Sequence, residues 1–219
     1  MFATDRDLLA IEPNLFRDAG IAGQRLLKGL CDISGTTLSL TAQDVDLAAA
    51  NIGPGHIALV DGTPYEVLAR LTPTTATISR LRASTTDPAQ PPSPATAKPI
   101  EVWTFAPQIA RAHDQVLRLL GIEPSDAPAP GAITEAAITN PRSLADVVVF
   151  GTISDIYWAT TRTLDSGRGG WAHTIWSRAQ MFRERFEGAR QIAAARIDTD
   201  GDVQPDATRR LNTLILTRA

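Results

Sequence analysis

The sequence predicts an α+β protein: a small β-barrel of the SH3-like or OB-like kind, a small bundle of about three helices, and a C-terminal β-hairpin. Three observations lead to this expectation. Between residues 32 and 105, short runs alternate apolar and polar side chains and are separated by close turns. Between residues 106 and 195, apolar residues instead recur every three or four positions. From residue 196 to 219, an acidic turn separates two further β-like runs.

Length and composition limit the class of protein. The chain has 219 residues, is 43% hydrophobic and 21% charged, and can bury a sizeable core in water. No run approaches the roughly 20 apolar residues of a membrane span, and the N-terminus lacks the pattern of a secretory signal. A single cysteine, Cys31, excludes an internal disulfide and a Cys-based zinc site, and fits a reducing compartment. The net charge of −3 argues against a surface that grips nucleic acid.

Arginines outnumber lysines 19 to 2. Arginine suits fixed carboxylate pairs and interfaces, because its planar guanidinium presents several donors at once. A GC-rich genome accounts for the same bias, so both explanations stay open.

The N-terminal 31 residues have mixed character. Thr4 and Asp7 have the spacing of a capping box, which predicts a short helix. Three glycines between residues 20 and 29 argue against a longer one. We expect residues 1–31 to form an N-terminal segment that packs on the helical part.

The barrel region contains the clearest local signal. Asp61 and Gly62 stand between two alternating runs, the pattern of a tight type I′ hairpin. Residues 84–99 hold five prolines and no large apolar residue, which predicts an exposed, extended and mobile loop. Residues 100–105 then predict the last strand, which closes the barrel.

Three helices are predicted next. The first ends at Gly121. Asn140 followed by Pro141 predicts the cap and first residue of a second helix, residues 141–164, which is apolar on most sides and therefore central. After the short connector 165–170, an amphipathic helix is expected to pack antiparallel to its predecessor.

An acidic stretch near the C-terminus raises the question of a metal site. Asp198, Asp200 and Asp202, with Gly201 among them, resemble the start of a calcium loop. The closing glutamate is missing, and Arg209 stands at position 12 of the first register. Aspartate and glycine also suit tight turns, so we expect the solvated tip of a hairpin. A calcium-dependent binding module that uses the three aspartates is the alternative.

No motif predicts an enzyme or a cofactor site. His56, His113 and His173 are far apart in the sequence, and no metal, nucleophile-elbow or phosphate-loop pattern occurs. His113 lies on the apolar face of its helix, where we expect a satisfied core or interface histidine. Trp171 and Trp176 are expected to be core or interface anchors. A hydrolase or transferase with a dispersed site near His56 or His113 stays as a third alternative.

The last fifty residues carry a longer motif, in which a helix with an early tryptophan and a "YR.RF..A" centre runs into an "R.D.DGDG..D..RR.N" hairpin. The matching residues are Trp176, Arg183, Phe186, Ala189, Arg196, Asp198, Asp200, Gly201, Asp202, Asp206, Arg209, Arg210 and Asn212. This region resembles the C-terminal part of head–tail connector (adaptor) proteins of long-tailed bacteriophages or related gene-transfer particles. Residues 107–195 are similar to that family in layout. Val203 departs from it, since a second glycine is expected there, and the minimal members lack the segment 32–105.

The resemblance implies a structural virion protein without enzymatic activity or cofactor. Such a subunit forms a ring, typically a dodecamer, on the portal at the capsid vertex, and the stopper and tail assemble on it. Genomic DNA passes through the lumen without sequence-specific binding. The protein would reside in the virion neck, and in the host cytoplasm during assembly. The barrel would contact the next neck protein or the capsid vertex.

The C-terminal segment 196–219 would then be a docking arm. Its terminal strand is apolar on more than one face, which suits strand addition to a neighbour or to the portal. The expected interface residues are Arg196, Ile197, Arg209, Arg210, Leu211, Leu214, Leu216, Trp171 and Trp176.

Overall fold

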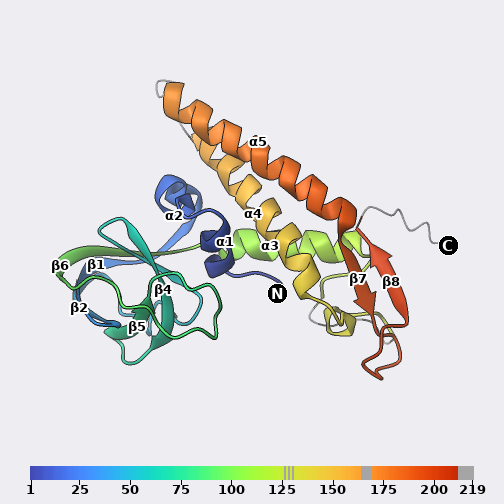
Figure 1. Cartoon of the computed structure of the whole chain (residues 1–219), viewed down its shortest axis with the longest axis horizontal. Helices are drawn as coiled ribbons and strands as arrows, with labels where there is room; N and C mark the ends of the chain where they lie inside the picture. The colour runs from blue at the N-terminus through green and yellow to red at the C-terminus, as the bar shows by residue number, and fades with distance from the viewer. Residues whose placement is uncertain (126, 128, 130, 164–168, 212–219) are drawn as a thin grey trace. The chain divides into compact units, whose positions relative to one another are not determined.

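The computed structural model describes residues 1–125, 127, 129, 131–163 and 169–211. The protein is α+β, as predicted, and divides into two compact units (Figure 1). One unit is Thr4–Ala106; the other combines Met1–Ala3 with Pro107–Ala219. Of the helices that the structure describes, none combines the length and the apolar character that a bilayer crossing requires.

The unit Thr4–Ala106 contains a closed antiparallel barrel of six strands, in the order β1-β2-β5-β4-β3-β6. The strands are β1 (Gln24–Ser34), β2 (Thr37–Gln43), β3 (Ile57–Val60), β4 (Thr63–Arg70), β5 (Thr75–Ser79) and β6 (Ala95–Thr104). Strand β6 pairs with both β1 and β3 and so closes the barrel, as expected of the run 100–105. The prediction of a small β-barrel is confirmed.

The tight hairpin between β3 and β4 is also confirmed. Val60 pairs with Thr63, and the two residues between them have positive φ angles, 50° at Asp61 and 75° at Gly62. Two consecutive positive φ values are the requirement of a type I′ turn.

The barrel begins earlier than the predicted residue 32. Strand β1 starts at Gln24 and pairs with β2 on one side and β6 on the other. Only Met1–Ala3 belong to the helical unit, so the expectation for residues 1–31 needs correction. Helices α1 (Asp5–Ile11) and α2 (Leu15–Asp18) precede β1, and the predicted Thr4 capping box forms at the start of α1.

Apolar side chains fill the barrel. Its buried residues are Leu27, Cys31, Ile33, Leu38, Leu40, Leu47, Ile52, Ala58, Val60, Val67, Ala76, Ile78, Ile100 and Val102. Gly29 lets β1 and β2 approach closely, because a Cβ there would overlap the carbonyl oxygen of Ala42. Burial raises the pKa of the Cys31 thiol to about 11, which keeps the sulfur in its unreactive protonated form.

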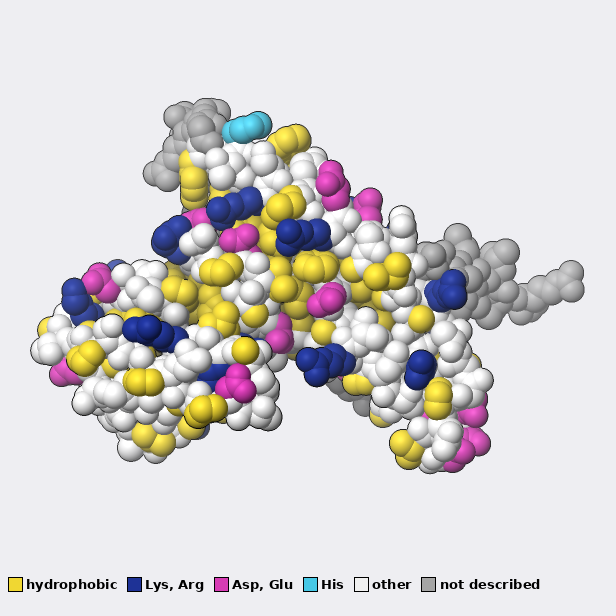
Figure 2. All heavy atoms as spheres, viewed as in Figure 1, with side chains coloured by type: hydrophobic (Ala, Val, Ile, Leu, Met, Phe, Trp, Pro, Cys, Tyr) yellow, Lys and Arg dark blue, Asp and Glu magenta, His cyan; other side chains and the backbone are white. Residues whose placement is uncertain are grey.

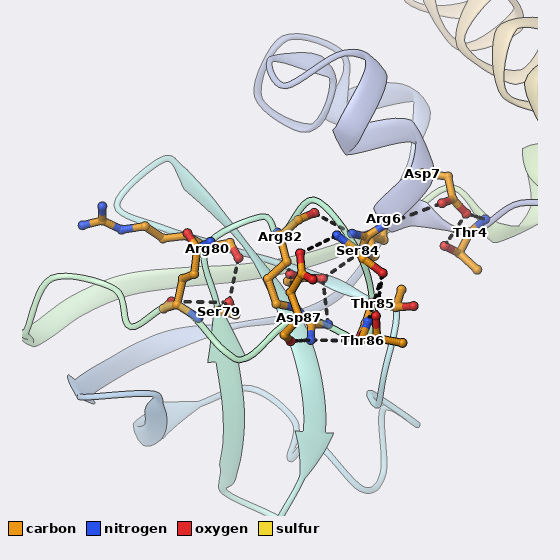
Figure 3. Close-up of polar contacts among 12 residues, drawn as sticks. Thr4, Arg6, Asp7, Ser79, Arg80, Arg82, Ser84, Thr85, Thr86 and Asp87 are labelled. Carbon is orange, nitrogen blue, oxygen red and sulfur yellow. Dashed lines mark hydrogen bonds and ion pairs between the residues drawn. The ribbon is translucent and has the colours of Figure 1, made fainter.

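The barrel also buries a carboxylate between two arginines. Glu66 is 1% exposed and accepts hydrogen bonds from Arg6 Nε at 2.9 Å and from Arg82 Nε at 2.7 Å. Arg82 in turn donates to the carbonyl oxygens of Thr85 and Asp87, at 2.9 and 2.7 Å (Figure 3). The proline-rich segment is thus tied to the barrel through Arg82.

That segment is shorter than predicted. Strand β6 takes up residues 95–99, because Ala95, Lys98 and Pro99 align with β1 in the sheet. The loop proper begins after β5, and Ser84 N–H donates to Asp87 Oδ2 at 2.8 Å near its start (Figure 3). The expected exposed loop 84–99 therefore ends at residue 94.

The other unit contains three long helices and a two-stranded sheet (Figure 1). Its elements are α3 (Ala106–Leu119), a 3-10 turn (Glu135–Ala137), α4 (Arg142–Thr163), α5 (Gly169–Ile192), β7 (Ala194–Ile197) and β8 (Ala207–Arg210). Helices α4 and α5 pack along each other. The predicted helix 141–164 differs from α4 by one residue at each end. Of the predicted connector 165–170, residues 165–168 lie outside the described residues.

His113 on α3 is a satisfied buried histidine, as predicted. It is 5% exposed, and its Nε2 lies 2.9 Å from Glu135 Oε2. The backbone N–H of Phe2 donates to Nδ1 at 3.3 Å. Both ring nitrogens have partners, so the histidine is part of the packing of this unit.

Candidate functional site

The C-terminal hairpin grows directly out of α5. The helix ends at Ile192, and β7 begins two residues later. Strands β7 and β8 pair antiparallel, with Ala195 opposite Arg209 and Ile197 opposite Ala207. The side chains of Ala195 and Ile197 are fully buried, which fixes one face of the hairpin on its own unit.

Polar contacts attach the hairpin to the start of α4. The Asn140 side-chain amide donates to the Ala194 carbonyl at 3.0 Å and accepts from the Arg196 N–H at 2.6 Å. Ser143 Oγ also lies 3.2 Å from the Ala194 carbonyl. The side chain of Asn140, which was predicted as a helix cap, thus bridges the start of α4 to β7. A cleft of about 480 Å³ lies beside these contacts, where α4, α5, β7 and β8 meet.

The two edges of this small sheet differ. Beyond β7, Ile138 forms a bridge with Ile197, and Thr139 N–H donates to the Arg196 carbonyl at 2.9 Å. In the part of the chain that the structure describes, β8 has no strand partner other than β7. The alternation of an antiparallel ladder turns the backbone groups of Thr208 and Arg210 toward that open edge. An open edge is a template for another strand.

The loop between the strands is shaped by its own aspartates. Asp198 accepts hydrogen bonds from the N–H groups of Gly201 and Val203, both at 2.7 Å. Asp206 accepts from the N–H and the hydroxyl of Thr199, at 2.7 and 2.8 Å. These N–H donors lower the pKa values of the Asp198 and Asp206 carboxyls. Both groups are therefore ionised near neutral pH, and the loop holds its shape through them.

The three aspartates predicted as calcium ligands differ by one residue from the three that the structure brings together. Among the described residues, Asp198, Asp200 and Asp206 offer carboxylate oxygens that lie within 4.8 Å of one another. Asp202 is outside this group and accepts from the Gln204 N–H instead, at 2.7 Å. The turn carries Asp202 away, and Asp206 returns from the start of β8.

Val203 is the most unusual residue of the loop. Its side chain is 79% exposed, and its φ angle is +70°. A β-branched residue in the left-handed region is strained, and glycine is the residue that suits this position. The loop thus presents a strained, exposed apolar side chain among four aspartates.

The expected interface residues fall into three groups. Arg196, Arg210, Trp171 and Trp176 are exposed, the two tryptophans by 37% and 44%. Ile197 and Leu211 are buried, and Arg209 Nη1 donates to the Leu120 carbonyl at 2.7 Å. These three therefore hold the hairpin to its own unit. Leu214 and Leu216 lie outside the described residues.

A second feature was not predicted from the sequence. Residues of α3, α4 and α5 line a hollow of about 430 Å³, which we call the arginine groove: Arg111, Asp155, Trp158, Ala159, Arg162 and Arg183. Figure 2 shows cationic side chains over α4 and α5. The four residues from α4 are spaced three and four apart, so the sequence alone places them on one face of that helix. Arg111 and Arg183 come from other helices, and only the packing of the three helices brings them to this face.

No family model, curated protein or solved structure matches this chain. The resemblance to head–tail connectors therefore rests on the motif residues of the last fifty positions.

Proposed function

We propose that this protein is a head–tail connector: a structural adaptor subunit that forms a ring, with the dodecamer as the expected state, on the portal of a long-tailed phage or related particle. The stopper and tail assemble on this ring, and the genome passes through its lumen without sequence-specific contacts. The subunit works in the virion neck and catalyses no reaction. The barrel faces a neck protein or the capsid vertex.

One observation carries the proposal. The motif residues from Trp176 to Arg210 fold as a single continuous element, in which α5 runs into β7, and Asp198 and Asp206 shape the loop. Among the described residues, the outer edge of β8 is open. An adaptor needs a strand that it can offer to another polypeptide, and β8 has that character. The hairpin thus acts as the docking arm of the small helical bundle.

Electron microscopy of the protein mixed with the portal of the same particle tests the proposal. The wild-type chain should add a ring to the portal, and a chain that ends at Leu211 should not. The cut follows Leu211 because this buried residue and Arg209 hold the hairpin in place. A truncated chain that docks as well as the full one would contradict the proposal.

A matched pair of variants tests the strand edge itself. Thr208→Pro removes the outward N–H of β8 and should weaken docking, whereas Thr208→Val keeps that N–H and should not. Circular dichroism checks that both variants keep the helices. Calcium addition serves as the control for the alternative function. A calcium-dependent rise in melting temperature that Asp200→Ala abolishes would favour the binding module instead.

A further inference from the structure

We propose that the acidic tip of the hairpin, residues 198–206, docks in the arginine groove of a second copy of this chain. The contact would join neighbouring subunits of the proposed ring, and to that extent it rests on the proposed function. The association of two copies can nevertheless be measured without a portal.

The groove is rich in positive charge. Three guanidinium groups, from Arg111, Arg162 and Arg183, line it against the single carboxylate of Asp155. Within the described residues, neither Arg111 nor Arg162 forms an ion pair with a carboxylate. Arg183 donates through Nε to Glu187 Oε1 at 2.8 Å and keeps its terminal nitrogens for other acceptors. The groove therefore offers several N–H donors that suit an anion.

The groove also has an apolar wall. Trp158 is half-buried on α4, and Ala159 lies beside it. An aromatic wall next to guanidinium groups favours a ligand that combines carboxylates with a small apolar group. A bare inorganic anion would leave this wall without a partner.

The acidic tip has the complementary composition. It carries four aspartates, and Val203 projects among them with 79% of its surface exposed. Carboxylates match the guanidinium donors, and the valine side chain matches the wall formed by Trp158.

The tip and the groove of one chain cannot meet. The hairpin is bonded to Asn140, at the start of α4, whereas the groove uses residues 155–162 of the same helix. At 1.5 Å per residue, this separation is roughly 20–30 Å along the axis. The turn of the hairpin also lies at the end of the unit opposite the far ends of α4 and α5 (Figure 1). An acidic tip that enters the groove therefore belongs to another copy.

Two different surfaces on one subunit make a heterologous contact, the type that closes rings or propagates filaments. Such a contact matches the ring that we propose. Nucleic acid is the competing occupant, since guanidinium groups also bind phosphates. A duplex would need a row of phosphate contacts, whereas this site is one hollow on a chain of net charge −3. The observations favour the acidic tip.

Charge exchange between the two surfaces tests the inference on the full chain. The groove variant carries Arg111→Glu and Arg162→Glu, and the tip variant carries Asp200→Arg and Asp202→Arg. Sedimentation equilibrium should show that the wild type self-associates and that added salt weakens the association. Each variant alone should lose at least about tenfold in association constant, because like charges now face each other. An equimolar mixture of the two variants should regain association, because each tip then meets a groove of opposite charge.

The control variant carries Arg17→Glu and Arg118→Glu, two exposed arginines outside the groove, and should associate like the wild type. A wild-type chain that stays monomeric at concentrations up to about 1 mM would overturn the inference. The inference also fails if the mixture of the two variants stays dissociated, or if the control loses as much in association constant as the groove variant. It fails as well if the groove variant self-associates like the wild type and loses only its binding to a short DNA duplex.

Portal docking separates this inference from the proposed function. If charge exchange restores association but no form binds the portal, the contact stands and the connector role fails. If both variants still form a complete ring on the portal, the tip–groove contact is wrong and the connector role survives.

Discussion

The two sheets that the structure describes differ in whether their edge strands are paired. In the barrel, each of the six strands has two neighbours, and the sheet has no free edge. In the hairpin, β7 is covered by Ile138 and Thr139, whereas β8 has an open edge in the described part of the chain. A closed sheet satisfies its own backbone groups, and an open one leaves groups that a partner strand can satisfy. The comparison therefore separates a sheet that leaves no edge for a partner from one that does.

The carboxylates follow the same division. In the unit that contains the barrel, Glu66 on β4 and Asp5 on α1 are buried and use internal partners. In the hairpin, Asp200 and Asp202 are exposed, and Asp198 binds the backbone of its own loop. Loss of a buried carboxylate should therefore harm the fold, whereas changes in the loop should alter mainly its contacts.

The largest expected change in the free energy of unfolding comes from the buried carboxylate of the barrel. Glu66→Ala leaves Arg6 and Arg82 largely buried, at 11% and 10% exposure, without their shared partner. The free energy of unfolding should fall by about 3–5 kcal/mol, measured by urea denaturation. Glu101→Ala is the control, since Glu101 is 35% exposed and its ion pairs are 3.8 and 3.9 Å long. Its loss should stay below about 1 kcal/mol. Equal losses would mean that the buried network is not what holds the barrel.

A smaller change, a gain in stability, is expected from a substitution in the hairpin loop. Val203→Gly should relieve the left-handed strain and raise stability by about 1 kcal/mol. Val203→Ala keeps a Cβ at the same φ and should give little or no gain. Both variants should associate more weakly than the wild type, because both remove the exposed apolar group. A glycine variant that is no more stable than the alanine variant would show that the loop is not strained.

The smallest effect is a contrast in pH dependence. Burial raises the pKa of Asp5, although Thr104 and the Phe105 N–H donate to its carboxylate. Its contribution to stability is complete below pH 3.8, the ordinary aspartate value, and is lost as the pH rises through the folded pKa. Backbone N–H donors lower the pKa of Asp198, so its contribution is present above pH 3.8 and is lost as the pH falls through the folded pKa.

NMR titration of the side-chain carboxyl carbons checks this contrast. The midpoint should lie above the ordinary value for Asp5 and below it for Asp198 and Asp206. Asp5→Asn should remove the loss of barrel stability on raising the pH, while leaving the hairpin titrations unchanged. Midpoints in the reverse order would mean that burial does not govern Asp5.

Much of the fold was predictable because local chemistry determines it. Asp61 and Gly62 required a turn with two positive φ angles, and the structure has that turn. The first strand was missed because Gly29 interrupts the alternation of Leu27, Cys31 and Ile33 along β1. Glycine is needed there for the close approach of β2, and no property of the local sequence reveals that approach.

The candidate site was predictable only in part. The acidic loop was visible because its aspartates are adjacent, but the exchange of Asp202 for Asp206 in the carboxylate group depends on how the turn folds. The expected roles of Ile197 and Leu211 at an interface conflict with their burial. The arginine groove draws its residues from three helices, and no spacing in the sequence joins Arg111 to Arg183.

Cys31 gives the protein a practical advantage for spectroscopy. It is the only native sulfhydryl, and burial keeps it protonated and shielded from alkylating reagents. A cysteine introduced on the exposed surface would therefore take up a maleimide dye selectively, with the native residue left in place. Fluorescence from a single dye on the hairpin would then follow the proposed association of subunits in real time.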